Sequence, residues 1–103
     1  MTSERIRAVR GEADAQVVCA DIRRSGAFVE FASRFMRDDD RKVARNALWI
    51  LTKATDDELS VLQPMLGDFI GLAMQTPDSS VRRLSLNVIE RLEISKEIGR
   101  AHV

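Results

Sequence analysis

The sequence has one cysteine, one histidine, two prolines and no tyrosine among its 103 residues. A single cysteine excludes an internal disulfide, and one cysteine with one histidine leaves too few ligands for a zinc site. With only five glycines as well, the chain is poor in the turn formers that a many-stranded sandwich needs. No apolar run approaches the roughly 20 residues of a membrane span, and the N-terminus has no signal-like core. These absences predict a soluble, cytoplasmic protein that binds no membrane.

Neither sign of charge is in excess, because 16 lysines and arginines balance 16 aspartates and glutamates. The overall charge therefore does not drive the chain onto nucleic acid, although a local basic face is compatible with this balance. Apolar residues make up 45% of the sequence, which is too many for a disordered chain. The length is that of one small domain, and we expect a single domain over residues 1–97.

Apolar residues recur at the spacing of amphipathic helices. Residues 41–54 carry one broad apolar stripe, and Asp40 is placed to cap the start of this helix. Thr55 and Glu58 have the spacing of a capping box, which predicts the start of the next helix. Pro64 is expected to interrupt or kink that helix, because proline removes a backbone donor and crowds the preceding turn.

The rest of the chain carries helical signals as well. A helix is predicted over residues 27–36, and another is predicted to start after Asp78. The stretch 3–24 is also helical in character, and Gly11 is expected to divide it in two. No alternating apolar run of useful length predicts a strand, so the sequence predicts an all-α fold.

The chain also repeats itself, since Val81 follows Val43 by 38 residues and the helices around them align in the same register. The other aligned pairs are Phe31 with Phe69, Met36 with Met74, Asp40 with Asp78, Arg45 with Arg83, Ala47 with Ser85, Leu48 with Leu86, Ile50 with Val88, and Leu51 with Ile89. A helix pair cannot cover its own apolar face, so repeated pairs stack and bury a core between neighbours. We therefore predict repeat units over 27–54 and 55–92, preceded by a degenerate helix or cap over 1–26.

These residues resemble the HEAT repeat, a close relative of the armadillo repeat. In that family an Asp-containing turn precedes a second helix that begins Val-Arg-x-x-small. The matching residues are Asp78, Val81, Arg82 and Ser85 in the second unit and Asp40, Val43 and Ala47 in the first. Ala44 departs from the pattern, because the family favours arginine there, and this departure weakens any Asp–Arg ladder at that junction. The resemblance implies a truncated, short right-handed α-solenoid of antiparallel helix pairs.

The last residues, 98–103, are a separate feature. They back-translate to ATC GGA AGA GCA CAC GTC, which looks like the start of a common short-read sequencing adapter. We therefore predict that this tail is non-native and that the natural protein continues beyond Lys96; a frayed polar tail is the alternative. An uncapped last repeat would expose apolar surface and favour self-association.

No set of residues predicts catalysis. The run Asp38–Asp40 is explained more simply by an exposed turn with one capping carboxylate than by the converging oxygens of a magnesium or calcium site. Cys19 lies among apolar neighbours and has no histidine to activate it, so we expect a small buried hydrophobic residue. No glycine-rich phosphate loop is present. The sequence predicts a non-enzymatic protein with no cofactor and no metal.

Trp49 lies about 160° from Ala47, the centre of the apolar stripe, at ~100° per residue. In HEAT-like solenoids the second helices line the concave surface, so the resemblance implies a partner-binding face there. Its predicted members are Lys42, Arg45, Trp49, Lys53, Arg83, Asn87 and Arg91. An aromatic ring among cations can pack on a ligand while arginine forks bind carboxylate or phosphate. The alternative is that Trp49 packs on lysine or arginine stems and the cations are solvated.

Two functions fit this face. The first is a scaffold or adaptor that binds a protein or peptide segment, acidic or extended, on the concave surface. The second is a nucleic-acid-binding module similar to the HEAT-like DNA alkylation-repair glycosylases, which cradle the duplex backbone in such a groove. That family implies a catalytic aspartate, which matches no position here, and the zero net charge also favours the first function.

Overall fold

The computed structural model describes the backbone of residues 1–101 and the side chains of residues 1–92. Within residues 1–101 the chain forms seven α-helices, one short 3-10 helix and no strand, which confirms the predicted all-α fold. The elements are α1 (Ser3–Arg7), α2 (Glu12–Ser25), α3 (Phe28–Phe35), α4 (Arg41–Leu51), α5 (Asp56–Ser60), η1 (Gln63–Met65), α6 (Leu66–Gln75) and α7 (Ser79–Ala101). The side chains of the predicted tail, 98–103, lie outside the described residues.

The second helix of each unit begins at an aspartate, as the sequence predicts. The Asp40 carboxylate accepts a hydrogen bond of 2.9 Å from the Lys42 N–H at the start of α4. The Asp78 carboxylate accepts one of 3.0 Å from the Val81 N–H at the start of α7. These bonds satisfy donors that have no partner within the helix. Helix α4 ends earlier than predicted, because residues 52–54 continue as a turn with hydrogen bonds between residues three apart.

The breaks between the other helices also follow local chemistry. Thr55 and Glu58 form the predicted capping box of α5. Pro64 lies in η1 and separates α5 from α6, as expected. Gly11 precedes α2 and divides it from α1. Helix α2 ends at Gly26, whose φ of 66° lies in the left-handed region that glycine adopts without steric cost.

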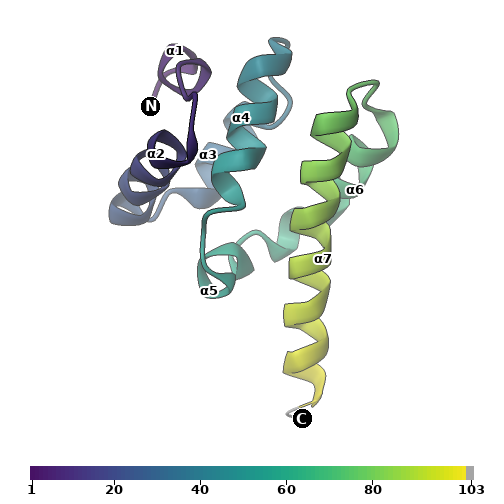
Figure 1. The fold of residues 1–103 in the computed structure, drawn as a ribbon. Helices are drawn as coiled ribbons and strands as arrows, with labels where there is room; N and C mark the ends of the chain where they lie inside the picture. The colour runs from purple at the N-terminus through teal and green to yellow at the C-terminus, as the bar shows by residue number, and fades with distance from the viewer. Residues whose placement is uncertain (102–103) are drawn as a thin grey trace.

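The 38-residue repeat is visible in the arrangement of the helices. Helix α3 packs on α4 and α6 packs on α7, and α4 and α7 also pack against each other. Helix α1 packs on the opposite side of α4, and its start precedes that of α4 by the same 38 residues. Figure 1 shows α1, α4 and α7 in a row, with α4 in the middle. The row of second helices is therefore an open stack and not a closed bundle.

At each junction in this row an arginine lies near an aspartate, as an ion pair at the first junction and as a nearby charge at the second. Arg7 Nε lies 3.3 Å from Asp40 Oδ2. Arg45, the residue 38 positions after Arg7, lies close to Asp78. The pKa of Asp78 is lowered chiefly by the hydrogen bond from Val81, and the charges of Arg41 and Arg45 lower it further. Ala44 stands where the family favours arginine, and the neighbouring Arg45 supplies the positive charge at this junction instead.

One continuous hydrophobic core runs between the helices. Its largest fully buried side chains include Phe35, Leu48, Phe69 and Leu92. Cys19 is fully buried among them, which confirms the predicted small hydrophobic residue, and burial raises the pKa of its thiol. Among the side chains of residues 1–92, Asn46 and Ser85 are the buried polar ones.

Replacing Ser85 with alanine is expected to stabilise the protein. Within the described part of the chain, the buried Ser85 hydroxyl has no hydrogen-bond partner, and the equivalent residue of the first unit is the buried Ala47. Because an unpaired buried hydroxyl costs roughly 1–3 kcal/mol, Ser85→Ala is expected to raise the free energy of unfolding by about 1 kcal/mol. Urea denaturation measures the change, and Ser33→Ala, at an exposed serine, is the control. A loss of stability in Ser85→Ala would contradict the prediction.

Candidate functional site

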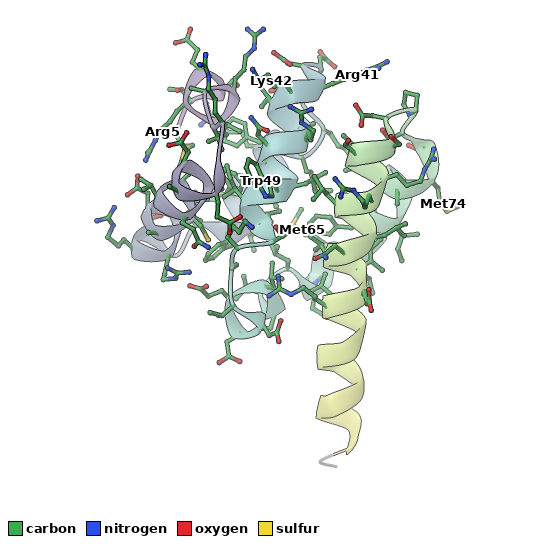
Figure 2. The ribbon with its side chains drawn as sticks, viewed as in Figure 1. Arg5, Arg41, Lys42, Trp49, Met65 and Met74 are labelled. Carbon is green, nitrogen blue, oxygen red and sulfur yellow. The ribbon has the colours of Figure 1, made fainter. Side chains whose placement is uncertain are left out.

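A groove of about 550 Å³ lies between α4 and α7, and the residues after α1 form part of its wall. Its lining residues are Val9, Arg10, Lys42, Arg45, Asn46, Trp49, Ser80, Arg83 and Leu84. The four residues from α4 fall on one side of the helix because they are spaced by three or four positions. Figure 2 shows Lys42 near the start of α4 and Trp49 farther along it. The groove thus exposes a strip of α4 between its two neighbours.

The lining of the groove is cationic. It contains Arg10, Lys42, Arg45 and Arg83 and no acidic side chain. Lys42, Arg45 and Arg83 are exposed, and no ion pair among the side chains of residues 1–92 involves any of these three. The chain has zero net charge overall, so this concentration of positive charge is a local property of the groove.

Trp49 is half-buried, so its side chain packs against the hydrophobic core and also lines the groove. Lys53 Nζ lies 5.7 Å from the centroid of the indole ring, at the distance of a cation–π contact. The same ammonium lies 2.8 Å from Glu12 Oε1, and this bond holds the pKa of Glu12 below its usual value. Lys53 therefore links α2 to α4 and holds one side of the ring.

The structure brings four of the seven predicted residues together in the groove, and these are Lys42, Arg45, Trp49 and Arg83. Lys53 lies beside them on Trp49. Asn87 lies outside the groove, in a shallow hollow along α7 that Arg83 also lines. Arg91 lies outside it too, since its guanidinium donates to the Asp56 carboxylate and to two backbone carbonyls at the end of α4.

Arg10 and Asn46 are lining residues that the sequence did not predict. Asn46 is 2% exposed, and its Nδ2 donates to the carbonyls of Ile6 (3.0 Å) and Val9 (3.1 Å) at the end of α1. The sequence marks Asn46 only as a polar residue among the apolar residues of α4. Arg10 carries no such signal, because only the packing of α1 on α4 brings it to the groove.

A metal site and a membrane-spanning helix each have requirements that the described residues do not meet. No group of three histidine, cysteine, aspartate or glutamate side chains among them could hold a metal ion. In the run Asp38–Asp40, the Asp38 carboxylate accepts from the Asp40 N–H, and Asp40 caps α4. No helix in this part of the chain is long and apolar enough to cross a membrane.

The repeated helix pairs, with their second helices side by side along a groove, define a helical-repeat protein. Comparison with known families matches residues 2–102 to the HEAT repeat domain. Because the match spans almost the whole chain, the protein belongs to the HEAT repeat family. Members of this family are generally non-enzymatic scaffolds that mediate protein interactions. No match was found among curated proteins or among solved structures.

Proposed function

We propose that this HEAT repeat protein is an adaptor that binds an extended, acidic protein segment in the groove between α4 and α7. The observation that carries the proposal is a half-buried tryptophan among four cationic side chains, with no carboxylate in the lining. Guanidinium groups bind carboxylates in a two-pronged geometry, which suits Arg45 and Arg83 to this role. An apolar or aromatic side chain of the segment would pack on Trp49, which offers a large contact area.

The size of the groove favours a short segment over a folded partner. Ligand pockets of about 300–1,000 Å³ hold groups the size of a few side chains, and this groove of about 550 Å³ lies in that range. Lys42 and Arg10 would add positive charge at the edges, which raises the rate of encounter with an acidic segment. Lys53, Asn87 and Arg91 remain predicted partner contacts, although none of the three belongs to the groove lining.

The same cations would also bind the phosphates of a nucleic acid, which is the second candidate function. Zero net charge favours the acidic protein segment, because a protein that neutralises many phosphates usually carries a broad basic surface. The two candidates differ in the salt dependence of binding. Duplex binding that weakens steeply between low and moderate salt indicates phosphate contacts.

Fluorescence provides the test, because Trp49 is the single tryptophan of the chain. A synthetic peptide of alternating glutamate and leucine is expected to change the Trp49 emission in a saturable way. The same peptide with glutamine in place of glutamate is the control and is expected to bind much more weakly. No saturable binding of the acidic peptide at low salt would contradict the proposal. Tighter binding of duplex DNA, with a steep salt dependence, would replace it by the nucleic-acid function.

Trp49→Ala is expected to weaken binding of the acidic peptide at least ten-fold, because the variant loses the surface on which the peptide packs. A fluorescent label on the peptide measures the affinity by anisotropy, and thermal unfolding of the variant is followed in parallel. Arg34→Gln, at an exposed arginine of α3 that does not line the groove, is the control and is expected to bind normally. If Trp49→Ala lost the roughly 3–5 kcal/mol of stability typical of a core aromatic residue, Trp49 would be structural and the proposal would fail.

A further inference from the structure

The outer side of α6 and α7 carries apolar residues whose counterparts in the first unit are buried. Ala32, Met36 and Leu48 are at most 2% exposed. The residues 38 positions later are Ile70 (38% exposed), Met74 (79%) and Leu86 (51%). Every one of these positions is apolar in both units, so the second unit keeps the composition of a covered face.

The first unit is covered because the second unit stacks on it. Met36 lies beside Leu72 and Val81 at the junction between the units, and α4 packs against α7. On the other side of α6 and α7, none of the described helices takes that place (Figure 1). Figure 2 shows Met74 at the outer edge of the molecule, pointing away from the other helices. Ile70, Met74 and Leu86 therefore form an uncovered stacking face, which we call the α6–α7 face.

The charges on α7 indicate what covers this face. One hollow along α7 is lined by Ser79, Arg82, Arg83, Leu86, Asn87 and Glu90, so these residues share one side of the helix. The Arg82 guanidinium donates to the carbonyls of Ala73 and Thr76 in its own chain, which leaves Arg83 and Glu90 as the charges available to a partner. Arg83 and Glu90 lie three residues on either side of the pair Leu86–Asn87. If two copies of α7 pack antiparallel about that pair, Arg83 of each copy meets Glu90 of the other. The contact is thus complementary to itself in charge and places the apolar Leu86 next to its centre, as suits a two-fold interface.

Head-to-tail stacking would pair α7 of one copy with a different surface of the next copy. Because α1 already occupies the position before α4, held by Asn46 through the carbonyls of Ile6 and Val9, that surface would be the outer side of α1. Such a contact would not bring Arg83 and Glu90 together, whereas the two-fold contact does. We therefore propose that this chain forms a two-fold symmetric dimer through the α6–α7 face, with antiparallel α7 helices and reciprocal contacts between Arg83 and Glu90. Arg83 also lines the groove, whereas Leu86 and Glu90 do not, so variants of Leu86 and Glu90 test the dimer without altering the groove lining.

Sedimentation equilibrium on the full chain tests the dimer. The mass is expected to rise with concentration from 11.6 kDa to twice that value and then to stop. Leu86→Lys is expected to remain monomeric over the same range with an unchanged circular dichroism spectrum, because the side chain is half exposed. Val17→Lys, at an equally exposed apolar residue of α2, is the control and is expected to dimerise normally. A wild-type chain that stays monomeric, or one that grows into larger assemblies, would overturn the proposal.

A charge exchange tests the two-fold geometry. In a dimer of Glu90→Arg, two arginines face each other in both contacts. In a dimer of Arg83→Glu, two glutamates face each other in both contacts. Each variant alone is therefore expected to dimerise at least ten-fold more weakly than the wild type. In an equimolar mixture one copy supplies two cations and the other two carboxylates, and a mixed dimer is expected to form. Native mass spectrometry, with one variant isotopically labelled, distinguishes the mixed dimer from the others. Failure of the mixture to associate, while the wild type dimerises, would rule out the antiparallel arrangement.

Discussion

Asn46→Ala is expected to lower the free energy of unfolding by roughly 1–3 kcal/mol, because it removes two buried hydrogen bonds. The Asn46 amide donates to the carbonyls of Ile6 and Val9 at the end of α1, and the Ile6 carbonyl also accepts from the Val9 N–H (3.2 Å). The side chains of Ile6 and Val9 are themselves buried against the rest of the core. Loss of the amide therefore weakens the attachment of all of α1, and thermal or urea denaturation measures the change.

The same substitution is expected to affect the groove. Val9 and Arg10 form its wall after α1, so a loosened α1 removes a cation and an apolar surface from the binding site. Hydrogen exchange is expected to accelerate in residues 3–9 more than in α6. Asn87→Ala is the matched control, since it makes the same chemical change at an exposed position of α7, and it is expected to alter stability by less than about 0.5 kcal/mol. Equal stability of Asn46→Ala and the wild type would show that the amide does not hold α1.

Arg91→Ala is expected to lower the free energy of unfolding by roughly 1.5–3 kcal/mol, because it removes charge-assisted hydrogen bonds from a partly buried position. The guanidinium donates to the carbonyls of Thr52 (3.0 Å) and Ala54 (2.6 Å) and to Asp56 Oδ1 (2.9 Å). These three acceptors surround the turn between α4 and α5. The Arg91 side chain of α7 therefore connects the end of the first unit to the second unit by hydrogen bonds. Denaturation with urea measures the loss.

Two further variants separate this role from a general effect of charge. Arg91→Lys keeps the charge but offers no planar fork, so it is expected to recover only part of the stability. Arg83→Ala removes an exposed arginine from the same helix and is expected to change the stability of the monomer little. If Arg91→Ala were as stable as Arg83→Ala, the contacts at the end of α4 would contribute nothing measurable.

The helix boundaries could be predicted because their causes are local. Asp40, Thr55 and Pro64 act on backbone groups within a few residues, so their effects follow from sequence spacing alone. The repeat could also be predicted, because an apolar pattern that recurs every 38 residues has to be buried between similar neighbours. In the candidate site, the same reasoning placed Lys42, Arg45 and Trp49 on one side of a single helix.

The sequence did not indicate how the long polar side chains are used. Arg91 and Arg83 occupy similar positions on α7, yet Arg91 reaches back to the end of α4 while Arg83 stays at the groove. Asn46 lies among apolar residues because α1 ends opposite it. No local sequence pattern predicts the hydrogen bond from Asn46 to the Ile6 carbonyl. Arginine and asparagine can satisfy their donors in several directions, and the choice depends on which acceptors another element brings near.

The sequence by itself therefore determined that this protein is a stack of helix pairs with a tryptophan and several cations on its second helices. Only the tertiary structure decided which of those cations line the groove, which fasten the units together, and which apolar residues stay uncovered at the α6–α7 face. The physical reason is the range of the interactions. Capping and helical periodicity act over a few residues, whereas these contacts join residues that are far apart in the chain and close only after the helices have packed.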